Sequence, residues 1–255
     1  MAKVRNQRRM LSDEELVQLV TLVKKADSVE LKASVPADDQ RAAVASLDLD
    51  PIEAQIRQVF FFDTPDLTLD QHGVVVRARR VQGRTGDTVV KLRPVEPADL
   101  PDRLRKSTSF GVEVDAMPGG YVCSGSMKGV VDPAHVRDAV GGKRSIRKLF
   151  SKEQRAFFAT HAPEGVELDD LSVLGPIFVL KLKRVPEGFA RKLTAEMWLY
   201  PDNSRVLELS TKCRPSEAFE TAMAARAFLT EKGIDLGAEQ QTKTRTALDL
   251  LVKSL

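Results

Sequence analysis

Apolar and polar residues alternate along much of this chain. Eight segments combine this period of two with β-branched and aromatic residues, and turn-forming residues separate them. They cover residues 28–35, 54–66, 74–82, 87–94, 109–117, 176–185, 193–200 and 205–213. The alternation predicts eight strands, most of them with one apolar face and one polar face. The tight, glycine-containing link GRTG at 83–86 predicts that the third and fourth strands form a hairpin.

Helical patterns lie between these strands. Ser12 with Glu15 has the spacing of a capping box and predicts a helix that ends near residue 26, and Ser151 with Gln154 repeats the pattern. Further helices are predicted over residues 36–47, 215–233 and 240–251. The helix over 215–233 ends at Gly233, and its apolar side is expected to contain Ala218, Phe219, Ala222, Ala225 and Leu229.

The order of these elements indicates one fold class. Residues from about 127 to 174 change in character and predict a mostly helical insertion. Eight antiparallel strands can close into a barrel whose interior holds one small ligand. We therefore expect an α+β protein with a single domain over residues 1–255. Its core would be an eight-stranded antiparallel β-barrel, with helices packed outside and the insertion at 127–174.

The polar faces of the predicted strands are charged. Their basic residues are Lys32, Arg77, Arg79, Lys91, Arg93, Lys181, Lys183 and Lys212, and their acidic residues are Glu30, Glu113, Asp115, Glu196 and Glu208. For any single strand, a charged face in water is the simpler interpretation. The amphipathic helices must bury their apolar stripes, however, and the apolar strand faces are the obvious partners. If helices cover the outside of a barrel, the charged faces point inward.

An inward charged face implies a charged ligand. The predicted hairpin places Arg77 near Lys91, and like charges at this spacing are destabilising unless something neutralises them. Unpaired buried charge is too costly for such a cavity to be dry. Basic side chains bind phosphate oxygens, while carboxylates suit Mg²⁺. We infer that the ligand is a polyphosphate with a divalent metal.

Composition and charge narrow the possible classes of protein and partner. Hydrophobic residues make up 42% of the 255 residues and charged residues 29%, which is typical of a globular protein. The net charge of +3 is too small to indicate nucleic acid as a partner. Two cysteines, no signal-peptide pattern and no apolar segment long enough for a membrane predict a cytoplasmic protein. The oligomeric state stays open.

Several segments, in order, resemble the CYTH or triphosphate tunnel metalloenzyme family. The matching segments are SVELK, FFFDTPDLTLDQHGVVVRARR, VVKLRPV, GVEVDA, FVLKLKR, AEMWLYPDNSRVLELSTK and QTKTRTAL. The segment FFDTPDLTL with the following glycine and VRARR is the most specific of them. The resemblance implies an eight-stranded tunnel, with Mg²⁺ or Mn²⁺ and a small-molecule triphosphate or polyphosphate inside. The family's activities include inorganic triphosphatase, thiamine triphosphatase and class IV adenylyl cyclase.

By this resemblance, the eight basic residues given above would bind phosphates, although Lys181 and Lys183 need not both do so. The five acidic residues Glu30, Glu113, Asp115, Glu196 and Glu208 would bind metal or orient water, and Glu30, Lys32 and Glu196 are the candidates for catalysis. Phosphoryl transfer needs mainly positioning and charge neutralisation, so no nucleophilic side chain is required. Trp198 is expected either to stack on a ligand ring or to have a structural role. We interpret Lys243 and Arg245 as a solvated face of the last helix rather than as a closure of one tunnel end.

The chain departs from the family pattern at two acids. The opening Glu-x-Glu-x-Lys pattern is here Ser28, Glu30 and Lys32, and the late acidic strand has Ser210 two residues after Glu208. Fewer carboxylates predict weak metal binding, or a binding protein derived from an enzyme. We favour a metal-dependent triphosphatase. The alternatives are a non-catalytic polyphosphate or nucleotide binder and an adenylyl cyclase, which ranks lowest because no base pocket can be identified. A polyanion-binding outer surface is a fourth class of function.

Overall fold

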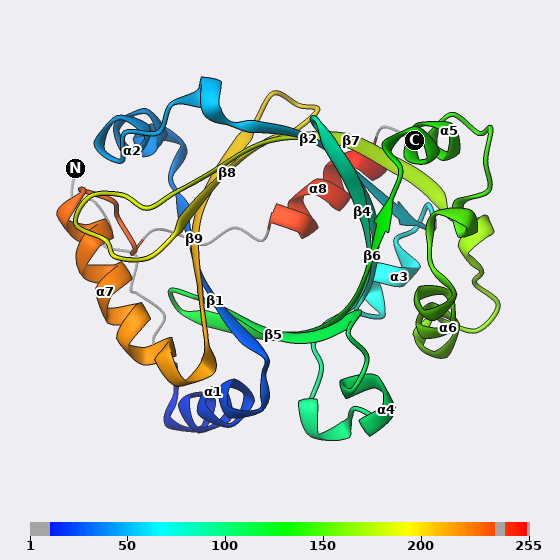
Figure 1. Cartoon of the computed structure of the whole chain (residues 1–255), viewed down its shortest axis with the longest axis horizontal. Helices are drawn as coiled ribbons and strands as arrows, with labels where there is room; N and C mark the ends of the chain where they lie inside the picture. The colour runs from blue at the N-terminus through cyan, green and yellow to red at the C-terminus, as the bar shows by residue number, and fades with distance from the viewer. Residues whose placement is uncertain (1–10, 238–242, 254–255) are drawn as a thin grey trace.

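The computed structural model describes residues 11–237 and 243–253. Within them, nine strands close into one barrel in the order β1-β5-β6-β4-β3-β2-β7-β8-β9, and β9 pairs with β1 (Figure 1). The strands are β1 (Ser28–Val35), β2 (Gln55–Asp63), β3 (Val74–Val81), β4 (Arg84–Leu92), β5 (Phe110–Met117), β6 (Gly120–Val131), β7 (Ser172–Arg184), β8 (Leu193–Leu199) and β9 (Arg205–Cys213). Neighbouring strands are antiparallel except β1 and β5, which are parallel.

The prediction of eight antiparallel strands is therefore wrong in two respects. The ninth strand is β6, whose sequence contains many small residues and lacks a clear apolar alternation. Its Gly129 is packed so closely that an added Cβ would lie 2.5 Å from the Gln154 Oε1 atom. An odd number of strands cannot alternate in direction around a closed ring, so at least one pair must be parallel. The predicted β3–β4 hairpin is present, and its turn lies at Gln82 and Gly83.

The helices are α1 (Asp13–Lys25), α2 (Gln40–Ser46), α3 (Thr68–Gln71), α4 (Asp102–Arg105), α5 (Pro133–Val140), α6 (Lys152–His161), α7 (Ala218–Glu231) and α8 (Lys243–Val252). Both predicted capping boxes are present, at Ser12 and at Ser151. The helical stretch between β6 and β7 begins after Val131 and ends before Ser172, so both ends of the predicted insertion are strand. The predicted start of the last helix, residue 240, lies outside the described residues.

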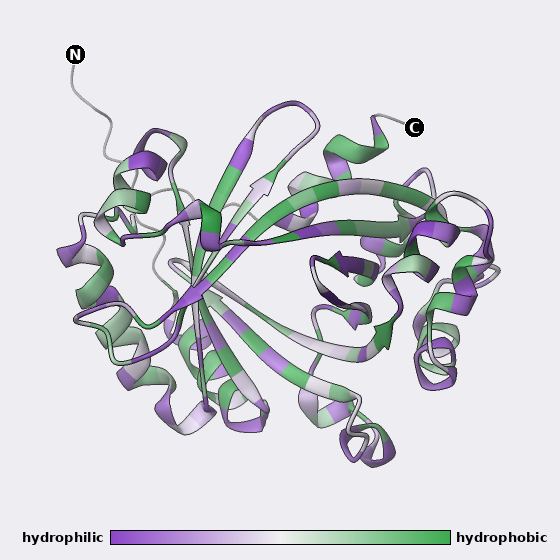
Figure 2. Cartoon of the chain, turned by 45° about the horizontal axis from the view of Figure 1, so that its top comes forward, coloured by the Kyte–Doolittle hydropathy of each residue, from purple (hydrophilic) through white to green (hydrophobic). Residues whose placement is uncertain are grey.

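Helices cover most of the outer face of the barrel. Figure 1 shows α1, α2, α5, α6 and α7 around the ring of strands, and Figure 2 shows hydrophobic and hydrophilic residues alternating along the strands. Beneath α1, α5 and α6 lie Val29, Val76, Val90, Val112 and Val114, all buried. Beneath α2 and α7 lie Ala33, Leu182, Ala195, Leu207 and Leu209. The apolar strand faces therefore point outward, as predicted, and the charged faces point into the barrel.

The helix α7 packs differently from the prediction. Ala225, Phe228 and Leu229 are buried against the barrel, but Phe219 is 81% exposed. No helix among the residues described has the length and apolar character needed to cross a membrane.

Candidate functional site

Three carboxylates converge inside the barrel. The parallel pairing of β1 with β5 places Ser28 beside Glu113 and Glu30 beside Asp115. One carboxylate oxygen from each of Glu30, Glu113 and Asp115 lies within 4.8 Å of the other two. Oxygen ligands at this spacing suit Mg²⁺ or Mn²⁺. The donor set thus fits the divalent cation that the sequence predicts.

Lysines surround this acidic cluster. The Lys32 Nζ atom lies 3.2 Å from Glu30 and 2.9 Å from Asp115, and the Lys91 Nζ atom lies 3.4 Å from Asp115. Lys212 pairs with Glu113 and is half exposed. Burial acts to lower the pKa of Lys32, but the carboxylates of Asp115 and Glu30 outweigh it and raise that pKa. Burial likewise acts to raise the pKa of Asp115, but Lys91 and Lys32 hold it below its ordinary value.

Ser28 and Ser210, which stand where the resembled family has acids, form hydrogen bonds with the cluster. The Ser28 hydroxyl donates a hydrogen bond of 3.2 Å to the Glu113 Oε2 atom. The Ser210 hydroxyl donates one of 3.0 Å to the Glu30 Oε1 atom. Each serine therefore lies beside an acid of the cluster and supports that acid with a neutral donor instead of adding a negative charge.

A second acidic pair lies on β8 and β9. Glu196 and Glu208 are direct cross-strand partners, an arrangement that is destabilising unless a cation neutralises it. The Lys243 Nζ atom lies 2.5 Å from Glu196 and 2.6 Å from Glu208, and Lys181 lies 2.5 Å from Glu196. Burial acts to raise the pKa of Glu196, but Lys243 and Lys181 hold it well below its ordinary value. Burial acts to lower the pKa of Lys243, but the two glutamates raise it.

Helix α8 brings Lys243 to this position. Figure 1 shows α8 lying across the ring of strands rather than outside it. Its Ala247, Leu248 and Leu251 are buried in a cluster with inward-facing residues of β2, β7, β8 and β9. These are Val59, Phe61, Ile177, Val179, Trp198 and Val206. The interpretation of Lys243 as solvated is therefore wrong: the apolar face of α8 fills one end of the barrel and carries Lys243 inside.

The same end contains Trp198, whose role the sequence leaves open, and Arg245, which the sequence analysis interprets as solvated. Trp198 is buried within the same cluster, its Nε1 atom donates to Glu196 at 3.3 Å, and the Lys243 Nζ atom lies 5.0 Å from its ring centre. Trp198 is thus part of the packing that holds Lys243. Arg245 differs, because it is 55% exposed and pairs with Asp70 at 2.7 Å.

Arginines dominate the opposite side of the interior. The Arg79 Nε atom donates to both carboxylate oxygens of Asp87, at 2.9 and 3.0 Å, while Arg77 lies 3.9 Å from the same carboxylate. The Arg77 Nε atom is buried, and no described residue forms a hydrogen bond with it. Burial and, next, the charge of Arg79 lower the pKa of Arg77 to about 9. Burial and Arg79 also lower the pKa of Arg57, which β2 brings to the same group.

The loop after β2 supports Arg93. The Asp63 carboxylate accepts backbone hydrogen bonds from Thr64, Leu69 and Asp70, at 2.7, 2.9 and 3.0 Å, so it fixes the turn. Asp70 in turn lies 3.8 Å from Arg93. Gly73 follows with a φ of +72°, and a Cβ there would lie 2.3 Å from the Arg93 carbonyl oxygen. The segment FFDTPDLTL and its glycine thus build the support of one basic residue.

The structure brings most of the predicted site residues into one interior. Lys183 and Lys212 are exposed, and Lys212 pairs with Glu113 at the edge of the site. The residues that the sequence reasoning missed are Arg57, Asp70, Asp87 and Lys243. Asp87 could have been found, because it lies four residues before Lys91, a predicted inward position on the same strand. Arg57 had no such signal, because no inward position was predicted on the strand over 54–66. Asp70 and Lys243 lie outside strands, where alternation gives no signal.

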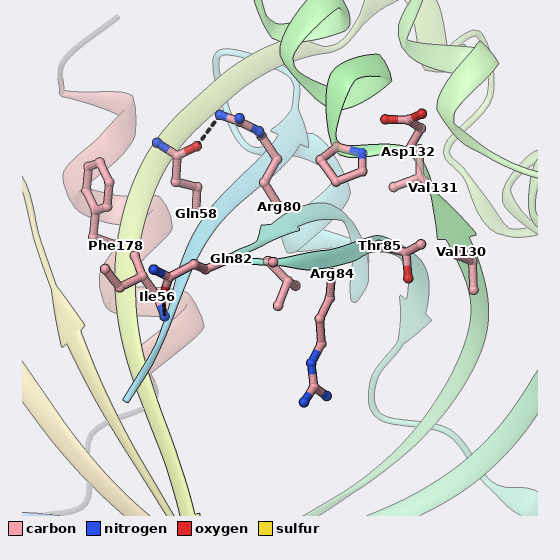
Figure 3. Close-up of a pocket in the computed structure, with 13 residues that line it drawn as sticks. Ile56, Gln58, Arg80, Gln82, Arg84, Thr85, Val130, Val131, Asp132 and Phe178 are labelled. Atoms are coloured by element: carbon pink, nitrogen blue, oxygen red, sulfur yellow. Dashed lines mark hydrogen bonds between the residues drawn. The ribbon is translucent and has the colours of Figure 1, made fainter. Parts of the chain in front are cut away.

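A separate hollow of about 880 Å³ lies at the outer face of the barrel. Figure 3 shows Ile56, Gln58, Arg80, Arg84 and Phe178 along it, with the Arg80 Nη1 atom donating to Gln58. Its lining contains none of the predicted site residues. The candidate site is therefore the barrel interior.

Comparisons with known proteins agree with this architecture. No protein-family model matches the chain, and no curated protein matches it. A Bacillus halodurans protein described as a "putative adenylate cyclase" is 11% identical, with a TM-score of 0.59 over 86% of this chain and 98% of that one. A second solved structure is HpAC1 from Hippeastrum, described as a "putative adenylyl cyclase" with a dominant triphosphatase activity. It is 15% identical, with a TM-score of 0.58 over 80% of this chain and 87% of that one. The CYTH resemblance of the sequence is thus confirmed at the level of the fold, which this chain shares with both proteins.

Proposed function

We propose that the barrel interior binds a triphosphate together with a divalent cation and hydrolyses it. One observation carries the proposal: Arg77 and Arg79 share the carboxylate of Asp87 while Arg57 lies beside them, and the buried Arg77 Nε atom has no partner among the described residues. Buried cations in excess are costly unless an anion neutralises them. A phosphate chain supplies several acceptor oxygens for guanidinium groups, which bind them through parallel hydrogen bonds.

The residues of the interior divide into a phosphate-binding group and a metal-binding group. Lys32, Lys91 and Arg93 continue the row of the arginines and would hold neighbouring phosphates, with Lys181 on the far side. Glu30, Glu113 and Asp115 would hold Mg²⁺ or Mn²⁺, which when bound neutralises phosphate charge and polarises the phosphorus–oxygen bonds. Glu196 takes the positioning role in this scheme, because it holds Lys181 and Lys243 in place.

The reaction needs no nucleophilic side chain. The oxygen of a water molecule attacks the terminal phosphorus, the bond from that phosphorus to the bridging oxygen breaks, and diphosphate and orthophosphate leave. Glu30 orients the water as an ionised group, because Lys32 and Lys243 outweigh the effect of burial and lower the pKa of its carboxyl. Lys32 stays protonated and stabilises the charge on the leaving oxygen.

A non-catalytic polyphosphate binder is the second candidate. Two observations favour it. Neutral serines stand at two positions where the resembled family has acids, and Lys243 lies between the carboxylates of Glu196 and Glu208. Both reduce the negative charge available to a metal. Binding would then use the basic rows alone.

The test is phosphate release from inorganic triphosphate, ATP and thiamine triphosphate, each with Mg²⁺, with Mn²⁺ and with a chelator. The variant Lys91→Ala with Arg93→Ala is compared with Arg137→Ala, which removes an exposed basic residue of α5. We expect metal-dependent release that the double variant loses and the control keeps. No release from any substrate, with binding lost only in the double variant, would support the binder. A cyclic nucleotide and diphosphate formed from ATP would support the cyclase instead.

A further inference from the structure

The outward face of α1 is apolar in its middle and charged at its ends. Leu16, Val17 and Val20 are 46%, 69% and 52% exposed, although the opposite side of the helix packs into the core through Leu22. Asp13 and Lys24 lie on the same outward stripe, since their spacings from Val17 and Val20 are one helical turn. Single exposed apolar residues are ordinary, but a continuous stripe of them on one helix indicates an interaction surface.

Helix α7 has exposed apolar residues of its own. Phe219 is 81% exposed and Met223 is 54% exposed, and they lie one turn apart near the start of α7. The turn Pro215–Glu217, which leads directly into α7, contacts α1, so the start of α7 lies near α1. Figures 1 and 2 show α1 beside this end of α7 in both views. Five of the eleven large apolar side chains exposed in the described residues therefore lie on these two helices.

The charges of α1 indicate which partner fits. Its first turn contains Asp13, Glu14 and Glu15, and its last turn contains Lys24 and Lys25. If a second α1 lies against the first in the opposite direction, the acidic end of each helix meets the basic end of the other. The apolar middles then meet as well. A two-fold axis requires such a self-complementary surface, because the same patch must contact itself.

We propose that the surface formed by Leu16, Val17, Val20, Phe219 and Met223 binds a second copy of this chain, with the two α1 helices antiparallel across a two-fold axis. The interface lies on the outside of the barrel, away from the charged interior. The proposal is therefore independent of the proposed function and stands or falls without it.

The first experiment measures the mass of the full chain in solution by sedimentation velocity over a series of concentrations. We expect a dimer whose dissociation is reversible. Val17→Glu with Val20→Glu should give a monomer with unchanged circular dichroism, and its melting temperature should equal that of the wild type diluted below its dissociation constant. Ile52→Glu is the control, because Ile52 is 92% exposed and lies in the turn before β2 rather than on either helix. A wild-type monomer at all concentrations would overturn the proposal, as would a dimer that the glutamate variant leaves intact.

A charge exchange tests the antiparallel arrangement itself. Asp13→Lys alone and Lys24→Asp alone each place like charges together twice in the dimer, and each should raise the dissociation constant by about tenfold, which is ~1.4 kcal/mol. The two substitutions combined should restore the wild-type constant. Failure of the combined variant to recover would exclude the antiparallel pairing. Deletion of residues 1–10 tests whether the chain's own first residues cover this face instead. If the protein associates only after the deletion, those residues cover the face in the full chain, and the proposal is overturned.

Discussion

At the scale of single residues, Lys243 decides how much negative charge the interior offers to a metal. Its ammonium lies between Glu196 and Glu208, where a divalent cation would otherwise fit. We predict that Lys243→Met raises the number of Mn²⁺ ions bound per chain from one to two in titration calorimetry. Without metal, Glu208 loses its cation and Glu196 keeps only Lys181, so the free energy of unfolding should fall by about 3–5 kcal/mol. Arg245→Met is the matched control on the same helix, and it should leave the count at one. An unchanged count in both variants would contradict the prediction.

Ser28 and Ser210 are the complementary case, since each gives a hydrogen bond where the resembled family has a carboxylate. The variant Ser28→Glu with Ser210→Glu adds two ligands beside Glu30 and Glu113. We expect Mn²⁺ to bind about tenfold more tightly or better, a gain of at least ~1.4 kcal/mol. Ser28→Ala with Ser210→Ala removes the hydrogen bonds without adding charge, so it separates the two effects. Equal dissociation constants for the glutamate variant and the wild type would show that the serines do not limit metal binding.

At the scale of elements, the sequence predicts the strands that show a clear alternation of apolar and polar residues, and it misses elements that do not show one. Eight strands are recognisable because large apolar residues occupy every second position. The strand β6 was not predicted, because Ser124 and Ser126 occupy its inward positions and its glycines lie beside bulky neighbours. The location of α8 inside the barrel was not predicted either. Its apolar stripe shows that α8 packs against another element. That element is the inner face of β2 and β7, whose other inward residues include charged ones, so the sequence does not identify it.

The packing of α8 allows a direct test. Leu248 is 2% exposed and contacts the inward-facing cluster at the closed end of the barrel. We predict that Leu248→Ala lowers the free energy of unfolding by about 2–4 kcal/mol, measured by urea denaturation, because it leaves a cavity beneath the helix. Val130→Ala, at a position that is 78% exposed, should change it by about 0.5 kcal/mol or less. Equal effects of the two substitutions would mean that α8 is not firmly packed inside the barrel.

At the scale of the whole molecule, the barrel separates its two kinds of surface. The outward strand faces are apolar and lie beneath helices, while most of the predicted charged residues meet inside. The sequence allows this separation to be predicted, because the face of a residue follows from its parity along the strand. It does not allow the individual pairs to be predicted. Lys91 of β4 meets Asp115 of β5 across the intervening strand β6, and this contact depends on the curvature of the closed barrel.

The interior charges also make stability depend on pH. Burial acts to raise the pKa values of Glu196 and Asp115, but lysines outweigh it, and both pKa values lie below their ordinary values of 4.5 and 3.8. Carboxyls with a lowered pKa in the folded state stabilise the fold above the ordinary pKa, and this contribution is lost as pH falls through the folded-state pKa. We therefore expect the melting temperature to hold near neutral pH and to fall below about pH 4.5. Glu196→Gln should melt lower than the wild type at pH 7, and the gap should narrow as the pH is lowered toward 3. Melting curves that stay equally far apart over this range would contradict the assignment of Glu196 as an ionised partner of Lys181 and Lys243.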